Sequence, residues 1–412
     1  MKVIKDSVHD HIHVDGVARD LLDTPALQRL RRIKQLGTVA FVYPSANHTR
    51  FEHSLGVYHL ACQALEHLEV EGKRAKRVEA AALLHDVGHG PFSHNLESLT
   101  YRRTGRYHDD VYALLAAGEV GEVLREHDLE PEAIADLVAG EGRFGQLVSG
   151  ELDVDRMDYL VRDAHHTGVP YGTIDPGRLL RELAFVEGEL VLEAGNVQTA
   201  ESLLVARALM NPAVYSHSVA RISKAMLRRA AERLLDAPEA DVDAVTLQRM
   251  DDADLLVALR SCEATADLSR RLDERTLFKR AVWAEIDAVP GGVIEADHEK
   301  IRSFEREIAD RAGVDDEDVI LDVPGRPSMT ESTSRVMVSG EIRRLEQQSP
   351  LVEALRAAQY SQWRLGVYSP ERLRDRVGQA AAEVLGLDID GALVSEVRNG
   401  DGLETTLDQF VD

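Results

Sequence analysis

The sequence predicts a mainly α-helical protein: a helical bundle core followed by a smaller C-terminal α/β portion. The 412 residues are 44% hydrophobic and 29% charged, a composition that permits a sizeable buried core. Through most of the first 290 residues, apolar side chains recur at three- and four-residue steps, which is the period of an amphipathic helix. The pattern changes at the Pro290-Gly291-Gly292 sequence. We therefore expect two domains, 1–290 and 291–412.

The predicted helices of the first domain follow one another with short breaks. Gly168 and Pro170 end one of them, because glycine readily takes a left-handed conformation and proline cannot continue a helix. Residues 198–235 should be helical with a bend at Pro212, which lacks a backbone donor, and residues 237–243 should be an acidic loop. The other helices are expected at 18–36, 54–68, 77–87, 111–124, 152–166 and 247–272.

The second domain combines strands with a helix. Runs rich in Val, Ile and Met predict strands at 319–323 and 335–338, and helical spacing returns at 350–359. The acidic residues 399–412 at the end of the sequence are expected to fray.

Composition also bounds the compartment. No stretch approaches 18 consecutive apolar residues, and the N-terminal MKVIKDSVHD lacks the apolar segment of a signal peptide. Cys62 and Cys262 form neither a metal-binding pair nor a disulfide framework, which fits a reducing compartment. We expect a cytoplasmic protein that contacts no membrane.

The net charge argues against an extended nucleic-acid surface. The chain carries 48 basic and 72 acidic residues, a net charge of −24, and such a surface repels a phosphate backbone. Only 8 of the basic residues are Lys, against 40 Arg. This bias fits either GC-rich coding or a halophilic protein, and unfolding measured across salt concentration distinguishes the two. Residues 1–60 carry a net charge of +2, so a small anion could bind in that region.

Histidine is concentrated in the first part of the chain, where 14 of the 16 lie before residue 167. The densest run is HDVGHGPFSH, residues 85–94, after the apolar segment 80–84. A buried helix should therefore deliver His85 and Asp86 from inside the fold, and His89 shares their helix face if the helix extends that far. Gly88, Gly90 and Pro91 then stop the helix.

A neighbouring imidazole and carboxylate suit a hydrolytic metal site. Two ligands hold a cation weakly, so His53 and Asp155 are candidates to complete the group. A His-Asp pair also occurs by chance, and the alternative is a buried hydrogen-bonded pair without a metal. The pair alone does not decide between these interpretations.

Four runs in a fixed order resemble the HD-domain phosphohydrolase superfamily, and within it the deoxynucleoside triphosphate triphosphohydrolases. They are DTPALQRLRRIKQLG (23–37), RFEHSLGV (50–57), LHDVGHGPFSH (84–94) and DVDRMDYLVRD (153–163). The resemblance covers roughly residues 1–220 and weakens beyond. It implies an HD-type helical bundle in the first domain, and we expect no counterpart of the SAM domain that some members carry.

The resemblance implies four metal ligands from separate helices: His53, His85, Asp86 and Asp155. The cation would be divalent, and Mn, Fe, Zn, Ni and Mg all accept imidazole or carboxylate, so the sequence does not choose among them. Its open positions would take water and a phosphate oxygen.

The resemblance also implies three residues that handle protons at the scissile phosphate: His89, Glu97 and His108. Glu97 stands where related enzymes have an Asp, so its role depends on whether the longer side chain still reaches a histidine. His108 could instead be an ordinary surface residue.

Substrate contacts follow from the resemblance as well. Phosphate or base-edge contacts are implied for Arg50, His94, Arg156, Arg207 and His217. Sugar contacts are implied for Gln35, Leu36, Tyr159, Asp163 and Tyr215, with the Tyr215 ring excluding a ribose 2′-hydroxyl. The alternatives are helix ion pairs for the arginines and core packing for the tyrosines.

The resemblance further implies an activating nucleotide and a homodimer or higher homo-oligomer. The activator would lie near Lys2, Val3, Asp23, Gln28 and Arg31. An Arg-rich helix face can equally be a solvated surface.

The implied reaction is metal-dependent hydrolysis of a deoxynucleoside triphosphate to a deoxynucleoside and inorganic triphosphate. Two alternatives remain open. One is another HD-type nucleotide phosphohydrolase, namely a phosphodiesterase, a 5′-nucleotidase or an alarmone hydrolase, with the same ligands and a different pocket. The other is a non-catalytic nucleotide sensor that keeps the metal for stability.

Overall fold

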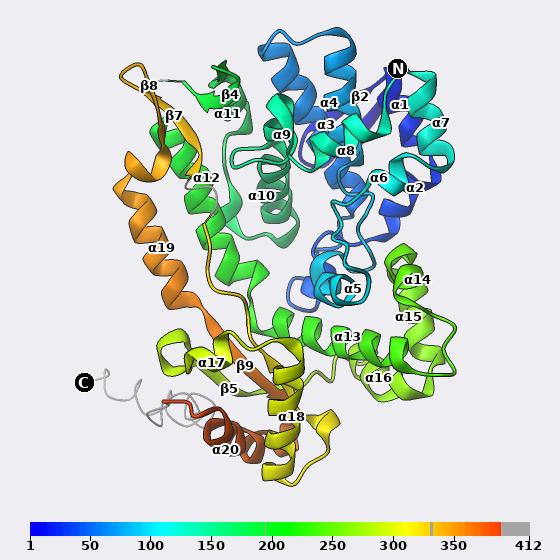
Figure 1. The fold of residues 1–412 in the computed structure, drawn as a ribbon, viewed down its shortest axis with the longest axis vertical. Coiled ribbons are helices and arrows are strands. Elements are labelled where there is room, and N and C mark those ends of the chain that lie inside the picture. The colour runs from blue at the N-terminus through cyan, green and yellow to red at the C-terminus, as the bar shows by residue number, and fades with distance from the viewer. Residues whose placement is uncertain (194, 330–332, 389–412) are drawn as a thin grey trace, which may run out of the picture. The chain divides into compact units, whose positions relative to one another are not determined.

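The computed structural model describes residues 1–193, 195–329 and 333–388. Helices dominate it, and three small sheets accompany them, so the predicted mainly α class with a smaller α/β part is confirmed (Figure 1). The predicted acidic tail at 399–412 lies outside the described residues. Within those residues, no helix combines the length and the hydrophobicity needed to cross a membrane.

The helices, in chain order, are α1 (Gly16–Leu22), α2 (Pro25–Arg29), α3 (Arg50–His67), α4 (Gly72–Leu84), α5 (Glu97–Thr104), α6 (Tyr112–Leu115), α7 (Gly118–Glu126), α8 (Pro131–Val138), α9 (Gly142–Val148), α10 (Val154–Thr167), α11 (Pro176–Arg181), α12 (Val197–Met210), α13 (Ser218–Asp236), α14 (Ala244–Arg249), α15 (Asp252–Ser261), α16 (Ala266–Asp273), α17 (Gly291–Ile294), α18 (His298–Ala312), α19 (Pro350–Gln362) and α20 (Arg374–Leu385). The strands are β1 (Lys2–Asp6), β2 (Asp10–Val14), β3 (Leu183–Val186), β4 (Glu189–Leu192), β5 (Lys279–Glu285), β6 (Ile320–Asp322), β7 (Arg335–Val338), β8 (Glu341–Arg344) and β9 (Arg364–Ser369).

The chain divides into two compact units, each built from separate segments. The first comprises Met1–Ala220, Leu227–Arg270 and Met329–Leu355, and the second comprises Arg221–Met226, Arg271–Ser328 and the chain from Arg356 onward. Strand β5 lies before residue 290 and belongs to the second unit, whereas β7 and β8 lie after it and belong to the first. The domain boundary expected at 290 stays a prediction.

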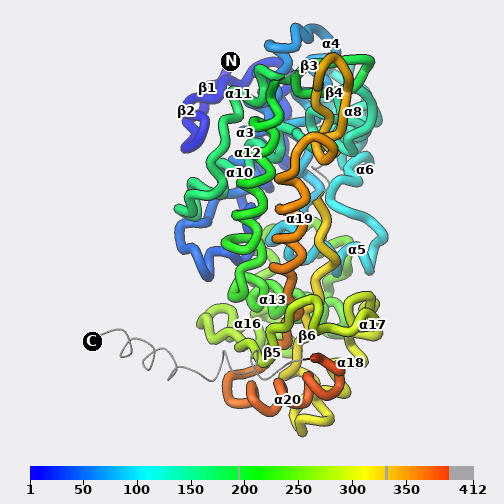
Figure 2. Tube along the Cα trace, turned by 90° about the vertical axis from the view of Figure 1, so that its left-hand side faces the viewer, coloured from blue at the N-terminus to red at the C-terminus, as the bar shows by residue number. Residues whose placement is uncertain are grey.

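The first unit holds a helical core and two of the sheets. Strands β1 and β2 pair antiparallel as an N-terminal hairpin, and the order of the second sheet is β3-β4-β7-β8, with β4 and β7 parallel. Helix α3 packs against α4 and α10, and α10 also packs against α12 (Figures 1 and 2). Long-range packing around α3 thus brings the runs 50–57, 84–94 and 153–163 together.

The second unit is the smaller α/β part. Its sheet has the order β5-β9-β6, with both pairs antiparallel. Helices α18 and α20 pack against this sheet and each other, around a core that includes Val282, Leu365 and Ile308.

Three predicted helices are wrong as continuous elements. The expected helix at 247–272 is divided into the end of α14, α15 and α16, because Met250, Asp251 and Cys262 are extended. The expected helix at 18–36 is broken between α1 and α2, because Pro25 occupies the first position of α2 and Thr24 before it is extended. The expected helix at 111–124 is divided into α6 and α7, where Ala117 is extended and Gly118 has a φ of +56°. The predicted bend at Pro212 is confirmed as a π-helical turn between α12 and α13.

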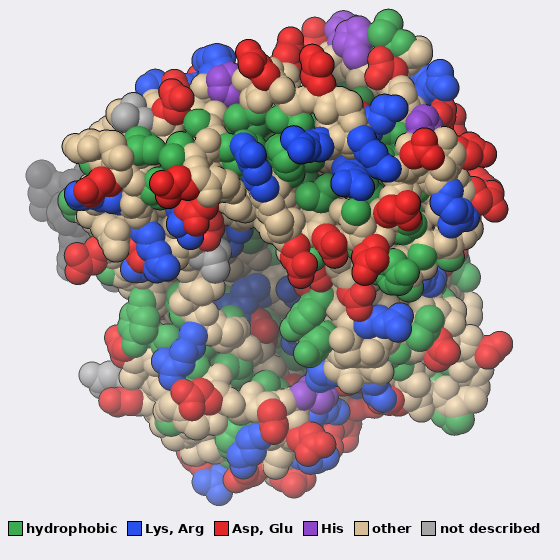
Figure 3. Space-filling view, turned by 45° about the horizontal axis from the view of Figure 1, so that its top comes forward, with side chains coloured by type: hydrophobic (Ala, Val, Ile, Leu, Met, Phe, Trp, Pro, Cys, Tyr) green, Lys and Arg blue, Asp and Glu red, His purple; other side chains and the backbone are tan. Residues whose placement is uncertain are grey.

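Basic side chains are interspersed among the acidic side chains of the surface. On the face that Figure 3 shows, Lys and Arg side chains lie among Asp and Glu side chains. Most of the ion pairs between exposed groups join Arg to a nearby carboxylate, for example Arg103 to Asp236 at 2.6 Å. Such pairs contribute little to stability individually.

Helices α3 and α10 approach closely at Gly56. A Cβ atom at this position would lie 1.8 Å from Oδ1 of Asp158 and 2.5 Å from Nη2 of Arg162, both buried. Only glycine fits, since either neighbour could move only by breaking buried polar contacts.

Gly56→Ala should therefore destabilise the protein, by about 1–3 kcal/mol or more, as expected for an overpacked interior. The control is Gly292→Ala, where an added Cβ meets nothing within 4 Å. Thermal unfolding of both variants checks this, and equal midpoints would contradict the close approach.

Candidate metal centre and active site

The first ligand candidate, His53, lies in the first turn of α3. The backbone N–H and the hydroxyl of Thr49 both donate to the Glu52 carboxylate, at 2.6 and 2.9 Å. This capping arrangement fixes where α3 begins. It places the fully buried His53 side chain at a set position on the helix face toward α10.

His85 and Asp86 occupy the turn that follows α4. This helix is buried over residues 80–84 and ends at Leu84, three residues earlier than expected. His85 and His89 therefore do not share a helix face. Gly88 is needed in this turn because of close packing and not only to end a helix, since a Cβ there would lie 1.9 Å from the His108 carbonyl oxygen.

The four predicted ligands converge. Nε2 of His53 lies 3.0 Å from Oδ1 of Asp155 and 3.3 Å from Nε2 of His85. Nε2 of His85 lies 3.5 Å from Oδ1 of Asp86 and 3.9 Å from Oδ1 of Asp155. Ligand atoms on one tetrahedral ion with bonds near 2.1 Å are about 3.4 Å apart. Ligand atoms of His53, His85 and Asp86 all lie within 4.8 Å of one another, a spacing that fits a single cation, and Asp155 approaches this group from the side of the two histidines.

The outer nitrogens of both histidines are already engaged. Nδ1 of His53 lies 2.8 Å from Oδ2 of Asp158, and Nδ1 of His85 lies 2.8 Å from the Ala82 carbonyl oxygen. A donor proton on each Nδ1 leaves each Nε2 with a lone pair directed at the other ligands. A carboxylate or carbonyl behind a ligating imidazole is the usual arrangement in metal sites.

The electrostatics of the group also favour a cation. Burial alone would lower the pKa of His53, but Asp155 and Asp158 outweigh burial and raise it to about 10. The surrounding carboxylates thus stabilise positive charge at this point. A divalent cation would supply that charge and displace the imidazolium proton.

The Arg50 side chain pairs with Asp86, one of the predicted metal ligands, and is not open to solvent. Its Nη1 donates to both oxygens of Asp86, at 2.9 and 2.8 Å, and its Nε donates to Oγ of Ser93 at 2.9 Å. Burial would raise the pKa of Asp86, but Arg50 holds it well below its usual range. The structure places Arg50 at the metal group, and its predicted phosphate contact stays a prediction.

The predicted proton-handling residues form a second cluster beside the first. The rings of His89 and His108 stack with centroids 3.9 Å apart, and the His94 ring meets both edge-on. Nε2 of His89 lies 3.3 Å from Oδ1 of Asp86, which joins the two clusters. Glu97 reaches two histidines, Nδ1 of His94 at 2.9 Å and Nδ1 of His108. The longer Glu side chain therefore still orients a histidine.

The environments of these two stacked histidines push their pKa values apart. Burial, with Arg50 and His108, holds the pKa of His89 well below its usual range. Burial would also lower the pKa of His108, but the Glu97 carboxylate outweighs burial and raises it. An imidazole whose pKa is lowered, beside one whose pKa is raised, is suited to the opposite proton-transfer role.

The predicted sugar contacts meet around Asp163. One carboxylate oxygen lies 2.8 Å from Nε2 of His48, and the other accepts from the Tyr215 hydroxyl at 2.9 Å. The Tyr215 ring meets the Tyr159 ring edge-on at 6.2 Å. Gln35 lies buried with its Oε1 without a hydrogen-bond partner among the described residues. A buried unpaired acceptor of this kind suits a ligand hydroxyl.

Among the remaining predicted substrate residues, Arg156 and His217 are engaged by other groups, whereas the charge of Arg207 opposes the rise that burial causes in the pKa of Tyr159 and Tyr215. Arg156 pairs with Asp153 at the start of α10, at 2.7 Å. His217 caps α13 by accepting from the Val219 amide, and its ring meets Tyr43 edge-on. Leu36 and Arg207 are half-buried, on the segment after α2 and on α12 respectively. Their roles stay predictions.

The residues predicted for an activator contact one another. Lys2 pairs with Asp23, and Arg31 donates to Oε1 of Gln28 at 2.9 Å while lying over the Phe51 ring. These contacts neither require nor exclude a nucleotide.

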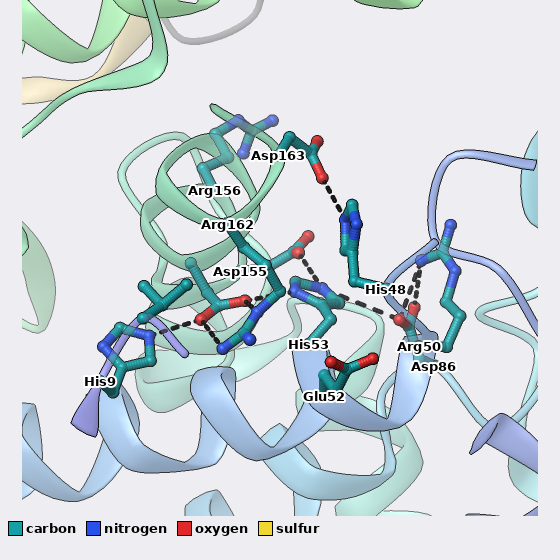
Figure 4. A network of polar contacts seen from close by, with 12 residues as sticks. His9, His48, Arg50, Glu52, His53, Asp86, Asp155, Arg156, Arg162 and Asp163 are labelled. Atoms are coloured by element: carbon teal, nitrogen blue, oxygen red, sulfur yellow. Dashed lines mark hydrogen bonds and ion pairs between the residues drawn. The ribbon is translucent and has the colours of Figure 1, made fainter. Parts of the chain in front are cut away.

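Sequence reasoning missed the residues behind the ligands. The Asp158 carboxylate contacts His53, lies 2.6 Å from Nε2 of His9 and accepts from Arg162 at 2.8 Å, and Arg162 also pairs with Asp6 in the N-terminal hairpin. Figure 4 labels His9, His53 and Arg162 of this group. All of them are buried or nearly so. The sequence did contain a signal for Asp158, namely its spacing: it lies three residues after Asp155 and thus on the same helix face. His48, the partner of Asp163, had no such signal.

A helical bundle that gathers two histidines and two aspartates from two helices and the turn after a third defines a class of metal-dependent hydrolases. Two family models match the chain: the HD domain over residues 50–163 and the HD associated region over residues 174–396. The chain belongs to the HD-domain phosphohydrolase family.

Relatives agree with this assignment. The chain is 34% identical to the uncharacterized protein MJ1154 of Methanocaldococcus jannaschii, over 93% of this chain and 84% of that protein. It is 32% identical to the deoxynucleoside triphosphate triphosphohydrolase SAMHD1 homolog of Dictyostelium discoideum, over 55% of this chain and 48% of that protein. A crystal structure of a phosphohydrolase from Bacteroides thetaiotaomicron matches with a TM-score of 0.71 at 28% identity, covering 90% of this chain and 100% of that one.

Asp158→Asn should weaken metal binding by about 10–100-fold, the usual effect of removing a carboxylate behind a ligating histidine. The amide keeps the shape but presents no negative charge to His53 and Arg162. Competition with a chelator, read by metal analysis, measures the affinity. Asp136→Asn, at an exposed site on α8, is the control, and equal affinity in the two variants would contradict the role of Asp158.

Proposed function

We propose that this protein hydrolyses deoxynucleoside triphosphates to a deoxynucleoside and inorganic triphosphate. The observation that carries the proposal is the junction of the two clusters, where Asp86 faces the other ligands on one side and His89, at 3.3 Å, on the other. A phosphate group at this junction would meet the cation site and the row of imidazoles together.

The residues divide the work of phosphate hydrolysis. When bound at the four-ligand group, a divalent cation supplies an activated water and offsets the charge of phosphate oxygens. As the bond between the α-phosphorus and the 5′-oxygen breaks, His108, which Glu97 keeps protonated to higher pH, donates a proton to the leaving 5′-oxygen, and His89 accepts the proton that the attacking water loses. His94, half-exposed at the edge of the cluster, contacts a phosphate oxygen.

The pocket around Asp163 supports a deoxyribose. Its carboxylate, held by His48 and Tyr215, would accept from the sugar 3′-hydroxyl. The buried Gln35 amide oxygen would accept from a further substrate hydroxyl. The Tyr215 ring would lie against C2′ and leave no room for a ribose hydroxyl. The name of the Dictyostelium relative supports the same substrate class.

Product analysis tests the proposal directly. Purified protein is incubated with each of the four deoxynucleotides and with Mn²⁺, Mg²⁺, Zn²⁺, Ni²⁺ or Fe²⁺, and the products are separated by chromatography. Deoxynucleoside with triphosphate supports the proposal. Pyrophosphate or monophosphate, turnover of ribonucleotides alone, or nucleotide binding without turnover in any metal would each replace it with one of the alternative functions.

Variants of two histidines should separate metal binding from proton transfer. His85→Ala should lose both the metal and turnover, because a ligand is gone. His89→Ala should keep the metal and lose turnover by about 10²–10⁴-fold, the usual contribution of an acid–base group. Metal content and turnover are measured on the same samples. Unchanged turnover in His89→Ala would overturn its role.

Glu97 should set the alkaline limit of activity. Since Glu97 raises the pKa of His108, the required proton is present below that pKa and is lost as pH rises through it. Glu97→Gln lowers this pKa, so the alkaline limb of the turnover profile should move to lower pH. Glu97→Asp keeps the charge and should leave the limb near its original place. An identical profile for Glu97→Gln would contradict the assignment of His108 as the acid.

A further inference from the structure

The loop between His89 and His94 has an unfavourable backbone. Phe92 and Ser93 have φ values of +55° and +57°, in the left-handed region that non-glycine residues rarely adopt. Two such residues in succession persist only where surrounding contacts hold them. The contacts that hold this loop therefore also set where His89 and His94 lie.

A carboxylate from a distant part of the chain provides one of these contacts. Oδ1 of Asp252 accepts from the Phe92 amide at 2.6 Å, and Oδ2 accepts from the Lys34 amide at 3.0 Å. Asp252 is 7% exposed and opens α15, about 160 residues after the loop. Both oxygens are thus used to join the loop to the segment after α2.

The end of α2 is tied to the loop by a guanidinium, that of Arg29. Nη2 of Arg29 donates to the carbonyl oxygens of His89, Gln248 and Met250, at 2.8, 2.9 and 2.7 Å, and its Nε donates to that of Arg249 at 2.7 Å. One side chain therefore joins residues 248–250 to the backbone of His89. Arg29 fixes the beginning of the loop, and Asp252 fixes its strained middle.

The loop also has a contact on its other side. The Ser93 hydroxyl donates to the Lys34 carbonyl oxygen at 2.6 Å and accepts from Nε of Arg50 at 2.9 Å. Lys34 thus contacts both partners through its backbone: its carbonyl oxygen accepts from the loop, and its amide donates to Asp252. This closed ring of contacts has no role in the chemistry assigned above.

We propose that Asp252 is a positioning residue: its carboxylate holds the 89–94 loop in its strained conformation and thereby places His89 and His94 at the reaction centre. The placement of a substrate phosphate there rests on the proposed function. The holding of the loop does not.

Asp252→Asn tests the proposal. The amide is isosteric but offers a single acceptor oxygen, so one of the two backbone N–H groups loses its partner. We expect kcat for the best deoxynucleotide to fall by at least about 10-fold, because a misplaced catalytic group costs up to ~10²-fold. KM should change much less, and metal content should not change, since Asp252 contacts no ligand.

Asp254→Asn is the matched control. Asp254 lies two residues along, is exposed, and accepts from the Asp251 amide, so its substitution removes the same charge from the same helix end without touching the loop. A variant pair with equal kcat would overturn the proposal, even if both are equally less stable than the original protein.

Hydrogen exchange followed by mass spectrometry gives a second readout that needs no substrate. The peptide spanning 85–96 should exchange faster in Asp252→Asn than in Asp254→Asn, and so should the peptide that contains Lys34, whose amide shares the carboxylate, with the other peptides unchanged. If the original protein turns over no deoxynucleotide, the proposed function fails while this comparison still decides the role of Asp252. If Asp252→Asn does not fold, slow exchange of the Phe92 and Lys34 amides in the original protein is required, and rapid exchange there overturns the proposal.

Discussion

The structure depends on the way His53 uses its two nitrogens. Nδ1 is committed to Asp158, so Nε2 is directed at His85 and Asp155, where a cation fits. Because His53 is fully buried between α3 and α10, neither nitrogen can be satisfied by water. Because Gly56 has no Cβ, the Asp158 carboxylate can come this close to α3. The metal group and the packing of the helices are therefore one arrangement.

Buried charge extends from this point to the N-terminal hairpin. Burial would raise the pKa of Asp158, but Arg162, with His53 and His9, holds it well below its usual range, and Arg162 is itself paired with Asp6. Removing one member of such a network leaves an uncompensated charge in the interior. The hairpin β1–β2 is thus a structural support of the ligand His53, although it contributes no ligand itself.

Much of the site could be predicted from the sequence, because its residues lie in short runs with fixed spacing. His85 and Asp86 follow an apolar helix and Asp155 lies in the first turn of another, so the local pattern made them candidates, and the resemblance of four ordered runs implied their role as ligands. Asp158 and His48 were missed because their roles depend on His53 and Asp163, which lie 105 and 115 residues away in the sequence, and spacing does not reveal such pairs. The single helix expected at 18–36 failed for a local reason, since Pro25 outweighs the apolar period around it. Strands β5 and β9 were missed because their pairing is non-local.

The most direct test of the account is anomalous diffraction from crystals grown with Mn²⁺, recorded at the manganese absorption edge. The account predicts one strong peak within about 2.0–2.3 Å of Nε2 of His53, Nε2 of His85 and a carboxylate oxygen of both Asp86 and Asp155. The histidines 89, 94 and 108 are also close enough to one another to hold an ion. A peak among those three histidines with none at the four-ligand group would contradict the central claim.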